Sequence, residues 1–227
     1  TFLRQPGMVA PFGLAFAPDG TLYLETDAND RGGRNFDTGT LWRLRPGERS
    51  ATVVARDLGR PRGLVVLGHG AGGGVGAPDL QAVAHVATAR GLAVVLTEQP
   101  YRVAGRRVPD RSPHLDACWR DMVAFVRREE AWEHLPLVAG GRSSGARVAC
   151  RTAADVGACG VLCLAFPTRP RPRRDGTAAP SRLPELEAVA VPALVVQGAR
   201  DPFGVPPPAP GRRVVEVAGD HSLRASA

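Results

Sequence analysis

Lysine is absent from this chain of 227 residues, and all 29 of its basic side chains are arginines. The absence excludes mechanisms that need an ε-amine. These are the phosphate-binding loop ending in Gly-Lys-Ser/Thr, the protein-kinase lysine, and Schiff-base catalysis with or without a pyridoxal cofactor. We interpret it as the codon bias of a GC-rich genome, because Ala, Gly, Pro and Val are abundant.

Long apolar runs and metal-binding patterns are also lacking. No window approaches the roughly 20 apolar residues that span a bilayer, and residues 1–4 do not begin a secretion signal. We therefore predict a cytoplasmic protein with no membrane partner. Its cysteines form no Cys-x-x-Cys pair and have no ligand-like spacing to histidine, so we predict reduced core thiols and no metal. They are Cys118, Cys150, Cys159 and Cys163. A net charge of +7 does not indicate a nucleic-acid partner, and nothing indicates the oligomeric state.

The chain changes character near residue 60. Residues 1–60 have the alternation and turn residues of two β-hairpins, with strands expected at 12–16, 21–25, 40–45 and 51–56. The strings Gly-Leu-Ala-Phe-Ala-Pro-Asp-Gly-Thr-Leu-Tyr-Leu and Gly-Thr-Leu-Trp-Arg-Leu resemble one blade of an NHL or gluconolactonase-type β-propeller. Because several blades are needed to close a propeller, its sites are not transferred. A fusion junction near 60–65 and an edge hairpin for the following sheet remain alternatives.

Residues 61–227 alternate apolar strands with helical stretches. Strands are expected at 63–68, 92–98, 137–141, 160–166, 193–198 and 213–218, and helices at 78–90, 115–131 and 144–156. Strands that are apolar on both faces indicate a parallel sheet covered by helices. The sequence therefore predicts an α/β fold with a doubly wound, mostly parallel sheet, preceded by a small β-hairpin segment.

The sequence Gly-Arg-Ser-Ser-Gly at 141–145 lies between an expected strand and an expected helix. This is the context that a nucleophile turn requires, because the two glycines avoid collisions with neighbouring backbone. Ser143 is the predicted nucleophile. The amides that begin the following helix favour a developing oxyanion.

A glycine-rich loop, Gly-His-Gly-Ala-Gly-Gly-Gly at 68–74, follows the first strand of the sheet. It lacks the Lys-Ser/Thr of a phosphate loop and fits an oxyanion loop, in which the amides of Ala71 and Ser144 hold the oxyanion. His69 is expected to hold the loop by hydrogen bonds. A plain glycine turn is the alternative.

Asp201 and His221 follow the strands at 193–198 and 213–218, in the order Ser, Asp, His. Both are at carboxyl ends of strands, where sites of open α/β sheets assemble. Asp201 would orient His221, and His221 would take the Ser143 proton. The other histidines flank or lie within helices or belong to the glycine-rich loop, and the neighbouring Asp220 points elsewhere.

Together these motifs make residues 62–223 resemble a small lidless α/β-hydrolase of the dienelactone-hydrolase-like kind. The resemblance implies the triad Ser143, Asp201 and His221, the oxyanion amides of Ala71 and Ser144, and no cofactor. Two departures are the blade-like segment at the start and the lack of the usual last helix, which would leave one sheet face uncovered. The expected function is a serine hydrolase acting on a small ester, lactone or thioester. A catalytically impaired binding or interaction module and a propeller fragment are the alternatives.

The sequence says little about which substrate is bound. Side chains expected to line the site are His69, Glu98, Arg102, Arg142 and Phe203. Arginine-rich loops at 101–107 and 168–174 leave the sheet at its catalytic edge. Their guanidinium groups favour an anionic acyl substrate if they line the site, and the alternative is a pair of solvated loops.

Overall fold

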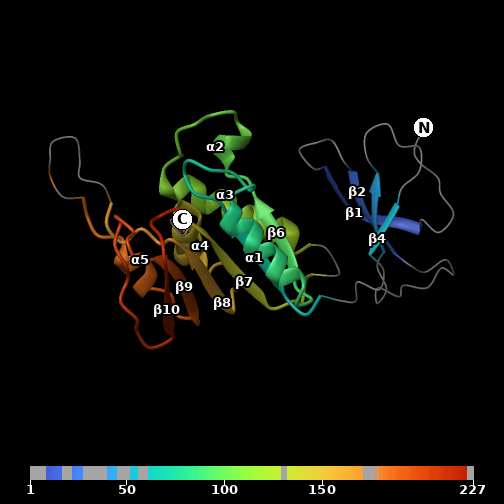
Figure 1. The fold of residues 1–227 in the computed structure, drawn as a ribbon. Helices are drawn as coiled ribbons and strands as arrows, with labels where there is room; N and C mark the ends of the chain where they lie inside the picture. The colour runs from blue at the N-terminus through green and yellow to red at the C-terminus, as the bar shows by residue number, and fades with distance from the viewer. Residues whose placement is uncertain are drawn as a thin grey trace. The chain divides into compact units, whose positions relative to one another are not determined.

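The structure is a computed structural model that describes residues 61–128, 132–170, 177 and 179–223, together with the backbone of four strands nearer the N-terminus. The chain separates into two compact units, Thr1–Pro61 and Arg62–Ala227 (Figure 1). Each unit is described by itself.

The first unit contains an antiparallel sheet with the order β1-β2-β3-β4. Its strands are β1 (Val9–Phe16), β2 (Leu22–Asp27), β3 (Thr40–Leu44) and β4 (Thr52–Ala55). They overlap the four strands expected from the sequence. The intervening loops lie outside the described residues, and the likeness to a propeller blade stays a prediction.

The second unit is built on a six-stranded sheet in which every pairing is parallel, with the order β10-β9-β8-β7-β5-β6. The predicted α/β fold with a doubly wound sheet is confirmed, and each strand lies within two residues of its expected bounds. The strands are β5 (Leu64–Gly68), β6 (Ala93–Thr97), β7 (Leu137–Arg142), β8 (Gly160–Leu164), β9 (Ala193–Gly198) and β10 (Arg212–Val217).

Three of the helices were expected from the apolar periodicity: α1 (Pro78–Thr88), α3 (Ser112–Val126) and α4 (Ser144–Thr152). Two short helices, α2 (Pro100–Val103) and α5 (Leu183–Glu187), were not. They are too short to show a helical period, and in each a proline at the first or second position favours the helical turn. Residues 129–131 of the expected second helix lie outside the described part.

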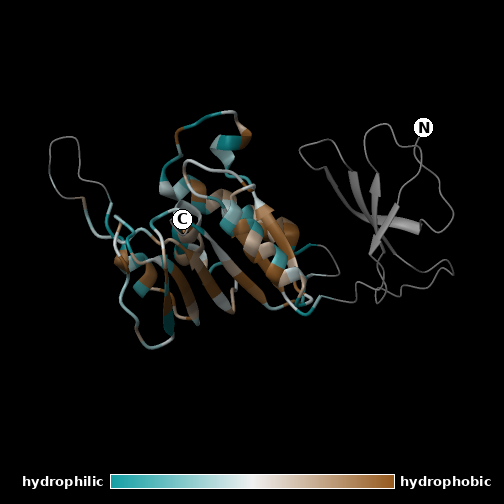
Figure 2. Ribbon diagram, in the orientation of Figure 1, coloured by the Kyte–Doolittle hydropathy of each residue, from teal (hydrophilic) through white to brown (hydrophobic). Residues whose placement is uncertain are grey.

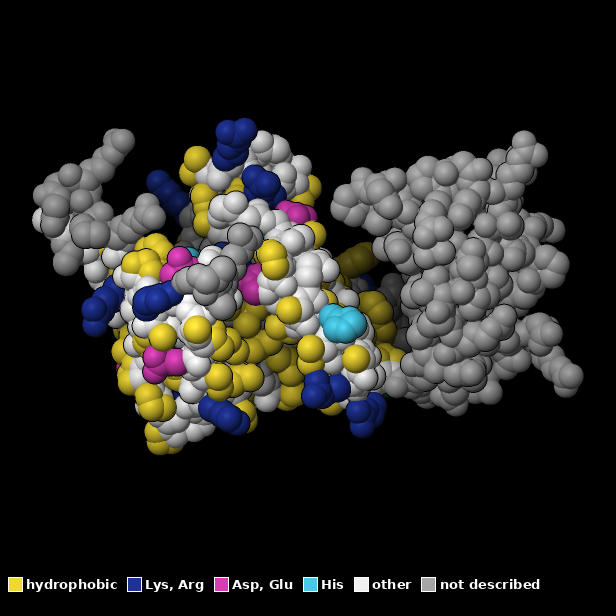
Figure 3. Space-filling model, in the orientation of Figure 1, with side chains coloured by type: hydrophobic (Ala, Val, Ile, Leu, Met, Phe, Trp, Pro, Cys, Tyr) yellow, Lys and Arg dark blue, Asp and Glu magenta, His cyan; other side chains and the backbone are white. Residues whose placement is uncertain are grey.

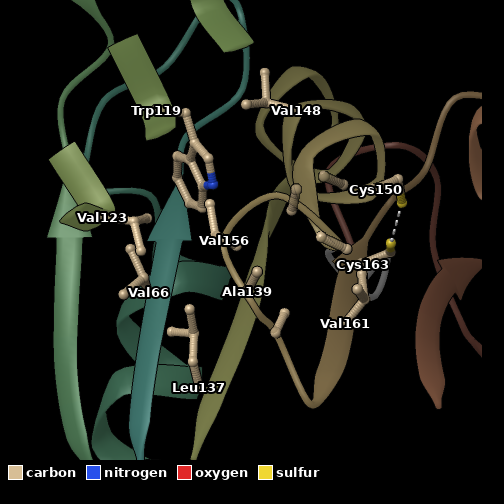
Figure 4. Close-up of a cluster of buried hydrophobic side chains, with 14 of the residues drawn as sticks. Val66, Trp119, Val123, Leu137, Ala139, Val148, Cys150, Val156, Val161 and Cys163 are labelled. Carbon is tan, nitrogen blue, oxygen red and sulfur yellow. Dashed lines mark hydrogen bonds between the residues drawn. The ribbon is translucent and has the colours of Figure 1, made fainter. Parts of the chain in front are cut away.

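The helices divide between the two faces of the sheet. The larger core lies where α3, α4 and α5 pack on the sheet, and Figure 4 shows Trp119 and Val123 of α3 beside Val66 of β5 and Ala139 of β7. A smaller core lies under α1, around Leu80. The apolar strands between these layers appear as the brown ribbons of Figure 2. Burial on both faces is what parallel strands require.

On the sheet face that α1 covers, several apolar side chains remain partly exposed to solvent. Leu194 of β9 is 39% exposed, and Val138, Leu162 and Val196 are only partly buried. The space-filling view shows apolar side chains gathered over this part of the unit (Figure 3). No helix within the described parts of the chain is long and apolar enough to cross a membrane.

The prediction that the cysteines are core thiols holds for two of the four. Cys150 and Cys163 are buried, with their sulfurs 3.5 Å apart (Figure 4). Cys118 is half-buried and Cys159 is exposed, which corrects the prediction for both. Cys159 precedes the first residue of β8, outside the buried part of that strand.

Candidate active site

The sheet order places the expected site residues at one point. β5 and β7 are neighbours, although β6 and α3 separate them in the sequence. The connection after β5 runs to β6 at the sheet edge, whereas the connection after β7 runs to β8 on the other side. Loops that diverge in this way at the carboxyl ends of parallel strands open a crevice. The glycine-rich loop after β5 and the Ser143 turn after β7 both begin there.

Ser143 occupies a strained turn between β7 and α4, with φ 50° and ψ −106°. Such backbone conformations cost on the order of 1–3 kcal/mol in non-glycine residues. The flanking glycines are needed because a Cβ at Gly141 or Gly145 would collide with the carbonyl oxygen of Gly68. α4 therefore begins in direct contact with the end of β5.

Three side chains from separate strand ends form one hydrogen-bonded chain. Ser143 Oγ lies 3.0 Å from His221 Nε2, and His221 Nδ1 lies 2.7 Å from Asp201 Oδ2. The Asp201 carboxylate is fully buried, and the His221 ring is 20% exposed. Since an ionised carboxylate only accepts hydrogen bonds, Nδ1 carries the proton and Nε2 is left to accept from the Ser143 hydroxyl.

The loop that follows β9 holds the Asp201 carboxylate. The Phe203 amide donates to Oδ1 at 2.8 Å, and Gln197 Nε2 donates to Oδ2 at 2.7 Å. The Phe203 ring packs edge-on against the His221 imidazole, with ring centroids 4.5 Å apart. Phe203, expected to line the site, therefore supports the histidine and the aspartate.

The glycine-rich loop passes directly over the Ser143 turn, since a Cβ built on Gly70 would lie 3.5 Å from Ser143 Cβ. The Gly70 carbonyl oxygen lies 2.7 Å from His69 Nδ1 and accepts from the Gly73 amide at 3.1 Å. In a trans peptide the next N–H points away from the carbonyl. Donation from His69 thus sets the direction of the Ala71 N–H, and His69 is fully buried in this role.

Residues at and after the end of β6 fasten the same loop. Tyr101 Oη donates to the Ala71 carbonyl at 2.9 Å, and Gln99 N donates to His69 Nε2 at 3.0 Å. Glu98 Oε1 accepts from the Val75 amide at 3.1 Å, and this bond fastens the loop. Its Oε2 lies 3.0 Å from His69 Nε2, the nitrogen that already accepts from Gln99. Burial raises the pKa of Tyr101, so its phenol keeps the donated proton.

The two arginines expected to line the site lie in different settings. Arg142 is turned toward α1 and the histidine loop: its Nε lies 2.7 Å from Asp79 Oδ2 and its Nη2 donates to the His221 carbonyl at 2.9 Å. Arg102 is exposed on α2. Arg171, Arg173 and Arg174 of the second arginine-rich loop lie outside the described residues.

An apolar pocket lies beside the Ser143 turn. It is bounded by Gly68 and Gly145 and by the residues that end β6, and its apolar wall comes largely from α3. Leu115 and Trp119, expected to be core, are buried as predicted, and they also form part of this wall. Within the described residues, no group of three or more His, Cys, Asp or Glu side chains could hold a metal ion.

Four residues that make contacts at the site were not among those expected from the sequence. They are Asp79, Gln99, Tyr101 and Gln197. Gln99 and Tyr101 closely follow an expected strand, so their place at the carboxyl edge of the sheet is a signal that could have identified them. Asp79 and Gln197 lie within an expected helix and an expected strand, where no motif distinguishes them.

Comparison with known proteins matches residues 61–225 to the family model described as alpha/beta hydrolase domain. No curated protein matches the chain. Among solved structures, an alpha/beta serine hydrolase without a lid from Xanthomonas campestris is 18% identical, with a TM-score of 0.55 over 96% of this chain and 88% of that one. Dienelactone hydrolase from Anabaena variabilis is 18% identical, with a TM-score of 0.54 over 82% of each chain. A serine hydrolase homologue from Coxiella burnetii is 15% identical, with a TM-score of 0.54 over 97% and 92%. At these identities the likeness concerns the fold.

Proposed function

The chain belongs to the alpha/beta hydrolase domain family, and we propose that it is a serine hydrolase that cleaves a small ester, lactone or thioester. The observation that carries the proposal is the unbroken chain of contacts from Ser143 through His221 to Asp201. A hydroxyl that lies on a strained turn next to a base, which is itself oriented by a buried carboxylate, has the arrangement of an activated nucleophile.

In the first half of the reaction, Ser143 Oγ attacks the substrate carbonyl carbon while His221 Nε2 takes the hydroxyl proton. Asp201 stabilises the imidazolium that forms. When the tetrahedral intermediate collapses, the bond to the leaving group breaks, and His221 returns the proton to that group. Water, deprotonated by the same imidazole, then cleaves the acyl-enzyme and regenerates the Ser143 hydroxyl.

The oxyanion of the intermediate would be held by the amides of Ala71 and Ser144. Ser144 is the first residue of α4, so its N–H has no partner within the helix. The Ala71 N–H is directed by the bonds to the Gly70 carbonyl. One such donor contributes a factor of about 100–1,000 in kcat. The apolar pocket bounded by Gly145 offers a place for an uncharged part of the substrate.

A fluorophosphonate probe tests the proposal. We expect the wild-type protein to be labelled, with the label lost in Ser143→Ala and retained in Ser112→Ala, a serine at the start of α3. A folded wild type that takes up no label would overturn the proposal and favour a non-catalytic binding module. Hydrolysis of p-nitrophenyl acetate and butyrate by the same variants would then establish turnover.

A further inference from the structure

Arg142 joins the two halves of the catalytic centre. It is the immediate neighbour of Ser143, and its Nη2 donates at 2.9 Å to the backbone carbonyl of His221, 79 residues later in the chain. The base is thus tied through its own backbone to the residue that precedes the nucleophile. We propose that Arg142 is a positioning residue that fixes the His221 backbone relative to the Ser143 turn, and that Asp79 holds Arg142 in place.

Asp79 is well placed for that second role. It lies in the first turn of α1, where its Oδ1 accepts from the Leu80 amide at 3.0 Å, and its Oδ2 lies 2.7 Å from Arg142 Nε. Only 11% of the Asp79 side chain and 19% of the Arg142 side chain are exposed. A guanidinium held by an ion pair presents its N–H groups in a rigid plane. This plane meets the His221 carbonyl.

The glycine-rich loop packs against the same guanidinium. A Cβ on Gly70 would lie 2.9 Å from Arg142 Nη1, which shows how closely the loop approaches the guanidinium. Arg142 therefore lies between the loop of the proposed oxyanion amide and the loop of the proposed base. Its sequence position suggested a substrate contact, whereas its guanidinium forms an ion pair with Asp79 and a hydrogen bond to the His221 carbonyl.

The loop that carries His221 is anchored to the Asp201 segment on one side and needs a second anchor on the side of the Ser143 turn. On its other side, the Arg200 amide donates to the Gly219 carbonyl and the Ala199 amide to the Val217 carbonyl, which anchors the loop to the Asp201 segment. The His221 side chain is likewise held by Asp201. These hydrogen bonds fix the distance from base to acid. Among the described residues, the hydrogen bond from Arg142 is the one that links the His221 backbone to the nucleophile turn.

The catalytic part of this proposal rests on the proposed serine hydrolase function, so the test has one readout that needs turnover and one that does not. In Arg142→Met, which keeps side-chain length but no donor, we expect kcat for a p-nitrophenyl ester to fall about 100-fold, as for a displacement of about 1 Å, while KM stays within about twofold. Arg142→Lys should recover part of the loss, because an ammonium can donate to only one of the two partners in the same geometry.

Hydrogen exchange of the backbone amides of 221–223 is the second readout. We expect at least a tenfold faster exchange in Arg142→Met, because the loop opens locally more often. Arg120→Met is the matched control, since Arg120 pairs with Asp155 at 3.0 Å on an exposed surface away from this loop. It should change neither readout.

A double variant distinguishes the proposed positioning role of Arg142 from a purely structural one. Arg142→Met with Asp79→Asn also removes the carboxylate that has lost its cationic partner, so thermal stability should recover while kcat stays low and exchange stays fast. Recovery of kcat together with stability would overturn the proposal, as would unchanged exchange in Arg142→Met. A higher KM with unchanged kcat and exchange would overturn it in favour of substrate binding. If the wild type takes up no fluorophosphonate, the proposed function fails, yet the exchange result still decides whether the tie exists.

Discussion

Gln197 Nε2 donates to Asp201 Oδ2 at 2.7 Å, the same oxygen that accepts from His221 Nδ1. Gln197 is fully buried on β9, and its Nε2 also lies within hydrogen-bond distance of the carbonyls of Phe166 and Gly204. Three acceptors around one nitrogen identify it as the amide NH2 group. Gln197 thus links the segment after β8, the loop after β9 and the carboxylate that orients the proposed base.

Replacing Gln197 by Met should lower kcat/KM about tenfold, because the Asp201 carboxylate loses a buried donor worth roughly 1.5 kcal/mol. Gln197→Glu should be worse, since two buried carboxylates would then face each other. Steady-state kinetics on the folded variants measure both effects. Equal kcat/KM in wild type and Gln197→Met would contradict the expected role.

Tyr101→Phe removes the donor that holds the Ala71 carbonyl while keeping the buried ring. We expect a loss of about 1 kcal/mol in the free energy of unfolding, measured by urea denaturation. Because Ala71 also carries the proposed oxyanion amide, kcat should fall several-fold with little change in KM. A change in stability without any change in kcat would show that Tyr101 does not affect catalysis through the oxyanion loop.

Gly145→Ala should be strongly destabilising, because the added methyl group would meet the backbone carbonyl of Gly68, which cannot move without shifting β5. We expect a loss of about 3 kcal/mol or more, at the upper end of the cost of overpacking. Gly76→Ala is the control, since a Cβ there has no neighbour within 4 Å, and it should change stability by less than about 0.5 kcal/mol. Similar melting temperatures for the two variants would refute the close approach of α4 to β5.

Acid should weaken the contact between α4 and α5. Burial raises the pKa of Glu185, but hydrogen bonds and charges from Arg147 and Arg151 outweigh it and hold the pKa below its ordinary value of 4.5. A carboxyl group with a lowered folded-state pKa stabilises the fold above its unfolded-state pKa, and this contribution disappears as the pH falls through the folded-state value.

Glu185→Gln should therefore cost about 1–2 kcal/mol at pH 7, a value reduced because the pair is partly solvated. The difference from wild type should shrink below about pH 4.5, as Glu185 becomes neutral like glutamine. Urea denaturation at several pH values measures it, with Glu187→Gln on the exposed side of α5 as the control. A difference that does not depend on pH would show that the charge of Glu185 is unimportant.

Local pattern was enough to predict the strands, the long helices and the turn that bears Ser143. Apolar runs bounded by glycine and proline mark β5, β7 and β9, and the carboxyl ends of parallel strands meet at one edge whatever the loop lengths. Asp201 and His221 could therefore be placed next to Ser143 before any contact was known. The short helices α2 and α5 were missed because four or five residues do not show a period.

The sequence by itself determined which basic side chains are available: without lysine, and with arginine always charged, histidine is the basic residue that can exchange protons near neutral pH, and the motifs place one histidine after the last strand of the sheet. Only the tertiary structure decided what the neighbouring side chains do. Arg142 faces Asp79 and the His221 carbonyl because the order and register of the sheet bring together residues up to 79 positions apart. Gln197 faces Asp201, four residues later, because the turn after β9 folds back onto the strand. Contacts of that range depend on packing between layers, which no local pattern of residues encodes.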